Sequence, residues 1–191
     1  MSYPVYQPAE DSYFLAEVIK EFLGSKTKKE LEKIKTLDMG TGSGIQLINC
    51  LKAGILKNNI LAIDINKEAI KHFKNLKIKT IKSNLFSKIP KNKKLKFDLI
   101  IFNPPYLPEN KYDKLPDTTG GKKGDETIIR FIKQLNGYLT KNGVCFLLIS
   151  SLTPESEWLA EAKKQKLNVN KIKTKSLFQE KLYIWEIKNK I

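Results

Sequence analysis

The sequence has 191 residues, of which 35 are Lys or Arg and 20 are Asp or Glu, which gives a formal net charge of +15 at pH 7. This length suits one well-cored domain and is too short for two of ordinary size. No apolar run approaches the roughly 20 residues that a membrane-spanning helix needs. The first residues also lack the charged-then-apolar layout of a secretory signal, so we expect a cytoplasmic protein.

The basic composition favours acidic partners such as nucleic acid or a ribonucleoprotein. However, Arg130 is the only arginine, and base-specific readout relies heavily on bidentate arginine contacts. Lysine spread along the whole chain is equally well explained by a general compositional bias or by adaptation to high temperature. Cys50 and Cys145 lie in apolar patterns far from other metal ligands, which predicts buried free thiols and no metal site.

Hydrophobic periodicity predicts alternating helices and strands. Residues 10–23 place their apolar side chains on one helical face, and short apolar or β-branched stretches follow. The expected strands are 34–39, 60–65, 78–82, 97–102 and 144–150, and the further expected helices are 45–53, 67–76, 126–139 and 154–166. Such alternation implies a parallel sheet with helices on both faces. Residues 168–174 and 181–187 predict an antiparallel hairpin at one sheet edge. We expect an α/β fold and a single domain over residues 1–191.

The first predicted strand runs into a glycine-rich loop, DMGTGSG, from Asp38 to Gly44. Glycine lets a backbone turn tightly and approach a ligand at the carboxyl edge of a sheet. The spacing G-x-G-x-G differs from the dinucleotide fingerprint, and an acid just before the loop suits a cationic ligand better than a pyrophosphate. We therefore expect Asp38 near the amino group of an amino-acid moiety, with Gly40 and Gly42 lining its path.

A second acid follows at the next strand tip. Asp64 lies 26 positions after Asp38 and is followed by Ile65. A carboxylate there is placed to accept hydrogen bonds from both ribose hydroxyls of a nucleoside cofactor. The alternative is that Asp64 only caps the helix that starts near Asn66. The glycine loop and this acid together predict a nucleoside cofactor; the loop spacing favours S-adenosylmethionine over NAD, and the next motif decides between them.

The strand at 97–102 leads into Asn103-Pro104-Pro105-Tyr106. The two prolines fix the backbone and remove two N–H donors, which leaves the carbonyls of Asn103 and Pro104 as rigid acceptors. The Asn103 side-chain oxygen adds an acceptor for a planar NH2 group, and Tyr106 can pack against that plane. A delocalised nitrogen needs orientation more than a general base. The sequence therefore predicts N-methyl transfer, with the only histidine, His72, solvated or structural.

Residues 38–44 and 103–106 together resemble the amino methyltransferases that carry an N-P-P-Y signature, which include adenine and cytosine modifiers and the HemK-like protein glutamine methyltransferases. Residues 6–12, YQPAEDS, are similar to the Y-x-P-x-E-D-[ST] opening of the short archaeal and eukaryotic branch, and 120–124, GGKKG, match its glycine-rich segment. That branch methylates the glutamine of the Gly-Gly-Gln motif in class I release factors. The resemblance implies a Rossmann-like class I methyltransferase fold. Its sheet has seven mostly parallel strands in the order 3-2-1-4-5-7-6.

The resemblance also implies roles for individual residues. Ser12 would meet the cofactor carboxylate, and Asn84 stands where the family usually has an aspartate for the adenine amino group. The residues assigned to S-adenosylmethionine are Ser12, Asp38, Gly40, Gly42, Asp64, Ile65, Asn84, Leu85 and Asn103, and those assigned to catalysis are Asn103, Pro104, Pro105 and Tyr106.

Two questions stay open from the sequence. Enzymes of this branch commonly work with a small zinc-ribbon activator protein at an exposed sheet edge, here expected at 78–82, although lysines there are equally explained as protection against aggregation. The alternative substrate is a flipped adenine or cytosine of DNA or RNA. The expected fold leaves no target-recognition domain, and the arginines for base readout are missing, so we favour a release factor. A cofactor-binding protein without catalysis is disfavoured, because the sequence contains all the groups expected to bind the target NH2 group. We call these groups, the Asn103 side chain and the Asn103 and Pro104 carbonyls, the clamp.

Overall fold

The computed structural model describes residues 4–74, 76–89, 95–109 and 118–190. Its strands are β1 (Thr36–Met39), β2 (Ile60–Asp64), β3 (Lys79–Lys82), β4 (Phe97–Phe102), β5 (Leu107–Pro108), β6 (Thr119–Gly121), β7 (Leu139–Ser150), β8 (Leu167–Ser176) and β9 (Lys181–Asn189). The helices are α1 (Glu10–Gly24), α2 (Lys28–Leu31), α3 (Ile45–Ala53), α4 (Lys67–Lys74), α5 (Glu126–Leu135) and α6 (Ser156–Lys164), with a 3-10 turn η1 (Lys57–Asn59).

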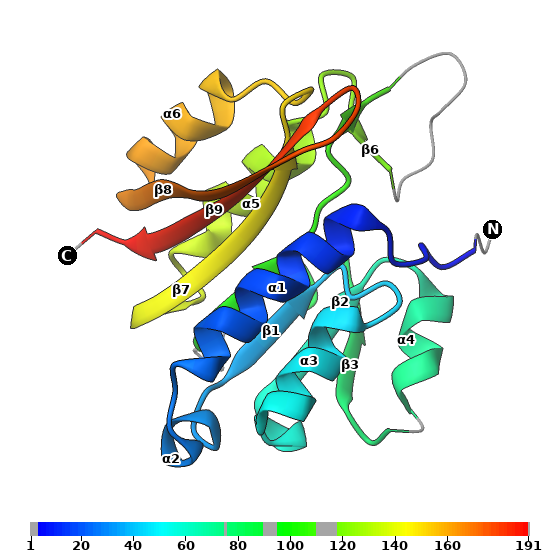
Figure 1. Cartoon of the computed structure of the whole chain (residues 1–191), viewed down its shortest axis with the longest axis vertical. Helices are drawn as coiled ribbons and strands as arrows, with labels where there is room; N and C mark the ends of the chain where they lie inside the picture. Colours follow the sequence, from blue (N-terminus) through cyan, green and yellow to red (C-terminus); the bar gives the residue numbers. More distant parts are fainter. Residues whose placement is uncertain (1–3, 75, 90–94, 110–117, 191) are drawn as a thin grey trace.

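Seven strands form one sheet in the spatial order β3-β2-β1-β4-β7-β9-β8, while β5 and β6 form a separate pair (Figure 1). Numbered along the chain within the large sheet, this order is 3-2-1-4-5-7-6. The strands from β3 to β7 pair in parallel, and β9 runs antiparallel to both β7 and β8. The expected α/β methyltransferase fold with its C-terminal antiparallel hairpin is confirmed.

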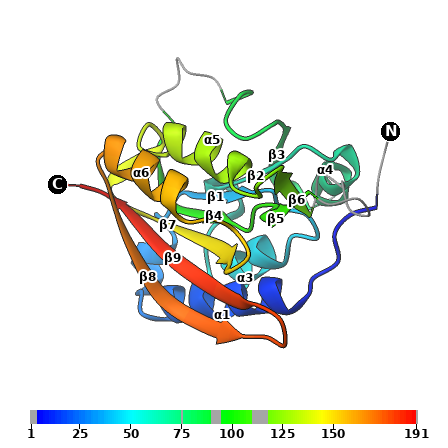
Figure 2. The ribbon, with the colours of Figure 1, turned by 90° about the horizontal axis from the view of Figure 1, so that it is seen from above.

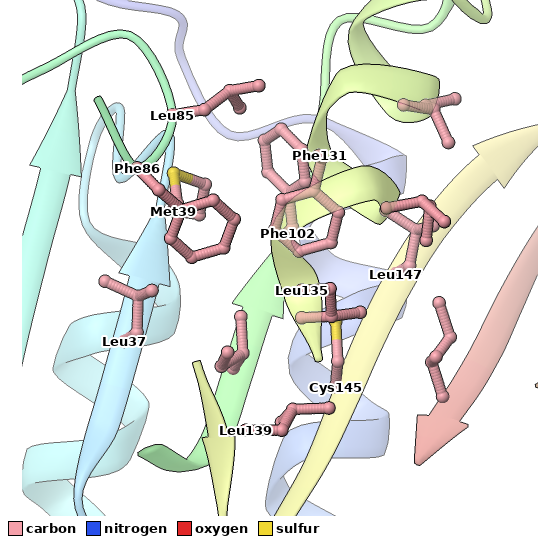
Figure 3. Close-up of a cluster of buried hydrophobic side chains, with 14 of the residues drawn as sticks. Leu37, Met39, Leu85, Phe86, Phe102, Phe131, Leu135, Leu139, Cys145 and Leu147 are labelled. Carbon is pink, nitrogen blue, oxygen red and sulfur yellow. The ribbon is translucent and has the colours of Figure 1, made fainter. Parts of the chain in front are cut away.

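Helices cover both faces of the sheet, with α1 and α3 on one side and α5 and α6 on the other (Figure 2). Side chains of β4 alternate between the two resulting cores: Ile100 and Phe102 enter one, and Leu99 and Ile101 enter the other. Burial on both faces explains why the central strands are mostly apolar. In the first core the rings of Phe102 and Phe131 lie 4.6 Å apart, at the carboxyl end of β4 (Figure 3).

Several element boundaries differ from the sequence prediction. The predicted helix 126–139 ends at Leu135 as α5, because Leu139 pairs with Phe97 and so belongs to β7, which starts five residues earlier than expected. Helix α4 ends at Lys74 rather than at residue 76, and residue 75 lies outside the described part. The short strands β5 and β6 were not predicted.

The two cysteines are buried free thiols, as expected. Burial raises the pKa of both the Cys50 and the Cys145 thiol, which keeps them protonated. In the described part, no cluster of three or more His, Cys, Asp or Glu side chains could hold a metal ion. Over the same residues, no helix is both long and apolar enough to span a bilayer.

The start of α3 depends on close packing between Gly44 and Phe73 of α4. Gly44 is the residue before the helix and has a left-handed φ of 79°. A Cβ atom at this position would lie 2.1 Å from Cζ of Phe73, whose side chain is fully buried. Only glycine therefore lets α4 pack against the glycine-rich loop.

We predict that Gly44→Ala lowers the free energy of unfolding by about 2–4 kcal/mol, because backbone strain and overpacking of a buried ring add together. Urea unfolding would measure the change. Gly24→Ala is the matched control, since a Cβ there meets no atom within 4 Å. That variant should lie within about 1 kcal/mol of wild type. Equal losses in the two variants would contradict the packing explanation.

Candidate active site

A cleft of about 510 Å³ opens at the carboxyl edge of the sheet, around the tips of β1, β2, β3 and β4. Its volume lies in the range of roughly 300–1,000 Å³ that is typical of small-molecule sites. It also lies at the switch point between β1 and β4, where open α/β sheets bind ligands. All the residues assigned from the sequence line this cleft: Ser12, Asp38, Gly40, Gly42, Asp64, Ile65, Asn84, Leu85, Asn103, Pro104, Pro105 and Tyr106. His72 is not among the lining residues and is exposed on α4.

The cleft is acidic although the chain as a whole is strongly basic. Its described lining contains five carboxylate side chains and one basic side chain, Arg130. The acids are Asp11, Asp38, Asp64, Glu109 and Glu126. A concave site of this charge attracts cations and repels a pyrophosphate. The lining therefore favours a positively charged small molecule.

Asp38 is the most deeply buried of these acids along the glycine loop. Its side chain is 3% exposed and accepts a hydrogen bond of 2.6 Å from the Thr41 hydroxyl. Burial disfavours the charged carboxylate and raises the pKa of Asp38 to about 7, with a smaller upward contribution from Asp64, while the bond from Thr41 acts in the opposite direction. A cationic group bound beside Asp38 would compensate for the lost hydration of the carboxylate.

Asp64 joins the two loops that follow β1 and β2. Its carboxylate accepts hydrogen bonds from the Gly42 N–H at 2.8 Å and from the Asn66 N–H at 2.7 Å. The start of α4 is capped by the Asn66 side chain, which accepts a bond of 3.0 Å from the Glu68 N–H. Helix capping at this position is therefore done by Asn66, and Asp64 remains among the residues that line the cleft.

The far end of the cleft is lined by Ile65, Asn84 and Leu85. Ile65 is 47% exposed, which is unusual for isoleucine and leaves its side chain open to a ligand. Leu85 has a φ of 50°, a left-handed value that is uncommon outside glycine and often marks functional sites. The Ser83 hydroxyl donates to the Leu85 carbonyl at 2.9 Å and holds this turn.

The orientation of Asn103 is set by Asp11, a residue to which the sequence assigned no role. The Asn103 amide NH2 donates to the Asp11 carboxylate at 2.8 Å, and the Tyr106 hydroxyl approaches the same oxygen at 3.4 Å. The other Asp11 oxygen accepts from the Ser12 N–H at 2.6 Å and from the Tyr6 hydroxyl at 3.2 Å. A carboxylate only accepts hydrogen bonds, so it selects the NH2 side of the amide.

The Asn103 side-chain oxygen is consequently turned away from Asp11. This atom is buried and has no hydrogen-bond partner among the residues that the structure describes. An unpaired buried acceptor is unfavourable, so a bound molecule that donates a hydrogen bond to it gains affinity. The Asn103 oxygen is therefore suited to accept a hydrogen bond from a bound molecule.

The glycine-rich segment at 120–124 packs directly on the backbone of the N-P-P-Y turn. A Cβ at Gly120 would lie 2.6 Å from the Pro105 carbonyl oxygen, and one at Gly124 would lie 2.5 Å from that of Tyr106. The Glu126 carboxylate holds the segment by accepting from the Gly124 N–H at 3.1 Å. The absence of side chains at Gly120 and Gly124 therefore lets the two backbones lie in close contact. The pairing of β5 with β6 continues this contact between the same two segments.

A parallel α/β sheet with an acidic cleft at its switch point and an oriented acceptor corner defines a class I methyltransferase. Residues 17–178 match the family model described as Methyltransferase small domain. A protein of Methanocaldococcus jannaschii, provisionally named a protein N5-glutamine methyltransferase, is 40% identical over 166 residues, which cover 83% of this chain and 79% of that protein.

Two further comparisons agree in family and fold. The release factor glutamine methyltransferase of Fusobacterium nucleatum is 36% identical over 125 residues, which cover 60% of this chain but only 32% of that enzyme. The fold also matches a solved structure of the E. cuniculi Mtq2-Trm112 complex, described as responsible for methylation of the eRF1 termination factor. The TM-score is 0.74 at 24% identity, covering 97% of this chain and 98% of the other. The chain belongs to the HemK-like family of S-adenosylmethionine-dependent protein glutamine methyltransferases.

The cleft fits S-adenosylmethionine because this cofactor carries positive charge on its sulfonium and its amino group, and the described lining is acidic. Asp38 and Gly40 would hold the methionine part, and Ser12 would meet its carboxylate. Asp64 would hold the ribose, while Ile65, Asn84 and Leu85 would contact the adenine.

We predict that the affinity for S-adenosylmethionine rises as pH increases through about 7, because Asp38 must be ionised to bind the cationic amino group. Below that pH, affinity should fall by roughly tenfold per pH unit. Calorimetric titration between about pH 5.5 and 8 would measure the dissociation constant of S-adenosylmethionine at each pH. Equal dissociation constants across this range would contradict the assignment of Asp38.

Asp38→Asn is the matched variant and should bind S-adenosylmethionine weakly at every pH in that range.

The stability of the cofactor-free protein should depend on pH in the opposite direction to the cofactor affinity, so it should fall as pH rises. The folded-state pKa of Asp38 is raised from 3.8 to about 7, so its contribution to stability is complete below 3.8 and is lost as pH rises through about 7. The variant should remove this part of the pH dependence in thermal unfolding.

Proposed function

We propose that this chain transfers a methyl group from S-adenosylmethionine to the side-chain amide nitrogen of the glutamine in the Gly-Gly-Gln motif of a class I release factor. The observation that carries the proposal is the Asn103 side-chain oxygen, which is buried, has no hydrogen-bond partner in the described part of the chain, and is oriented by Asp11. A glutamine amide presents an uncharged NH2 group with two hydrogens, and such an acceptor fits it. The names of the relatives support the same substrate.

In this proposal the clamp orients a weak nucleophile. The bound cofactor supplies a methyl group on a positively charged sulfur. The Asn103 side-chain oxygen accepts one hydrogen of the target NH2 group, and the Pro104 carbonyl accepts the other. Because both acceptors are fixed before the reaction, they favour the positive charge that develops on the nitrogen at no cost in reorganisation. Tyr106 packs beside the amide plane and, with Pro105, limits access of water.

Asp11 contributes to the clamp through Asn103. Its negative charge lies behind the Asn103 NH2 group, so it polarises the amide and strengthens the acceptor oxygen on the opposite side. Ser12 and Tyr6 donate hydrogen bonds to the same carboxylate and hold it in place. We therefore assign Asp11 a positioning role.

The proposal can be tested with S-adenosylmethionine that carries an isotope label in its methyl group. When release factor, RNA and DNA are offered side by side, we predict that the label appears in the glutamine of the release factor. Asn103→Ala should lower kcat by about 10²- to 10³-fold, because it removes an acceptor that acts on the transition state. Its dissociation constant for S-adenosylmethionine should stay within about threefold of wild type. Label in nucleic acid alone would overturn the substrate, since adenine and cytosine also present a planar NH2 group.

Asp64→Ala is the contrasting variant for this assay. It removes a carboxylate that lines the cleft away from the clamp, so it should weaken cofactor binding in the same calorimetric titration. If Asn103→Ala and Asp64→Ala lost cofactor affinity equally, Asn103 would not act on the target amide.

We also propose that a small zinc-ribbon activator protein pairs with the edge strand β3. This strand is the outermost strand on one side of the sheet, and its two terminal lysines are exposed while Thr80 and Ile81 between them are half-buried. An edge strand offers unpaired backbone groups to a partner. The similar E. cuniculi structure was solved as a complex with Trm112, which supports a partner protein for this chain.

We predict that binding of the activator slows amide hydrogen exchange within β3, because new inter-strand hydrogen bonds protect its N–H groups. The opposite edge strand, β8, is an internal control and should exchange at an unchanged rate. Exchange measured by mass spectrometry with and without the activator would distinguish the two edges. Protection of β8, or of neither strand, would contradict the proposal.

A further inference from the structure

Two exposed apolar side chains lie at the same edge of the sheet as the cleft but are not among the residues that line it. Leu152 follows the end of β7 and is 50% exposed, and Phe178 in the turn between β8 and β9 is 99% exposed. Both lie at the carboxyl edge of the sheet, where the cleft opens, and Figure 1 shows the β8–β9 turn at the same end of the molecule as β6. We call Leu152 and Phe178 the rim patch.

Hydrogen bonds fix the two segments that carry the rim patch, one to the N-P-P-Y turn and the other to the end of β7. The Thr153 hydroxyl, next to Leu152, donates to the Tyr106 carbonyl at 2.7 Å. The turn that carries Phe178 is closed by a bond of 2.8 Å from the Leu177 N–H to the Glu180 carbonyl. The Glu180 carboxylate in turn accepts a hydrogen bond from the Ser150 hydroxyl at the end of β7.

Folding does not require the exposed ring of Phe178. Its neighbour Leu177 packs against the core on the α1 side of the sheet and so anchors the turn. Scattered exposed apolar residues need no explanation. A phenylalanine that is almost completely exposed, on a fixed turn beside a catalytic cleft, is instead typical of an interaction site, because aromatic anchors provide much of the binding energy of protein interfaces.

The substrate in the proposed function creates a need for such an anchor. Two of the three residues in a Gly-Gly-Gln motif have no side chain, so the motif itself offers little surface for recognition. Binding energy from parts of a substrate remote from the reacting group can hold that group in place. A protein substrate should therefore make a second contact outside the cleft.

We propose that the rim patch is the docking site for the folded domain of the protein that carries the target glutamine, outside its target loop. This inference rests on the proposed function. The complementary surface is an apolar depression bordered by carboxylates, because Lys175 and Lys181 flank the turn and the chain carries a net charge of +15. Phe178 inserts into the depression, and Leu152 contacts its border.

Steady-state kinetics with two substrates test this docking site. With the intact class I release factor, Phe178→Ala should raise KM about tenfold and leave kcat within about twofold, because docking energy is lost but the clamp is unchanged. With a short free peptide that contains Gly-Gly-Gln, the same variant should leave kcat/KM within about twofold of wild type. Leu152→Ala should raise KM for the intact factor by about threefold.

Leu56→Ala is the matched control. Leu56 is 49% exposed, almost the same as Leu152, but it precedes β2 and so lies at the opposite edge of the sheet. Its kinetics should equal those of wild type with both substrates. Each of the three side chains is about half exposed or more, so its truncation should remove little packing. The thermal unfolding temperature of each variant should therefore match that of wild type.

The outcomes separate the docking site from the proposed function. An active enzyme whose KM for the release factor is unchanged in Phe178→Ala would overturn the docking site alone. An equal loss with factor and peptide would also overturn it, because Phe178 would then act at the cleft. A wild-type enzyme that methylates RNA but no release factor would overturn both the proposed function and this inference.

Discussion

The hydrogen bond between Asp11 and Asn103 connects the first helix of the protein to the turn after β4, across 92 positions of the sequence. It determines which end of the Asn103 amide points into the cleft, and so whether the corner offers an acceptor or a donor. The two partners come together only when α1 is packed on the sheet and β4 is in place beside β1. The chemical character of the corner is therefore a property of the complete fold.

Much of the site could be predicted because its residues occur in short contiguous runs at strand ends. The glycine loop, the acid after β2 and the N-P-P-Y turn are each recognisable locally, and parallel strands bring their carboxyl ends to one edge. All the assigned residues accordingly line one cleft. The fold was predictable for a related reason, since both faces of the sheet are covered and the central strands are mostly apolar.

Other features could not be predicted because they depend on distant contacts. The partner of Asp11 has no local signal, and the pKa of Asp38 reflects burial that arises only after folding. Strands β5 and β6 have two and three residues, too few for any periodicity. The early start of β7 follows from the pairing of Leu139 with Phe97, whereas the local pattern continues the helix.

The sign of charge reverses between the surface and the cleft. Lysines distributed over a strongly basic chain act at long range and draw acidic macromolecules toward the enzyme. The carboxylates of the cleft act at short range on a small cation. Composition reveals only the first of these effects, which is why a nucleic-acid substrate looked plausible from the total charge.

The acidic lining also affects how the enzyme turns over. Methyl transfer converts a sulfonium ion into a neutral thioether, so the spent cofactor carries one positive charge fewer than the fresh one. Coulomb attraction to the cleft decreases by the corresponding amount. The carboxylates that attract the methyl donor would therefore attract the spent cofactor less strongly, which would favour exchange of one for the other.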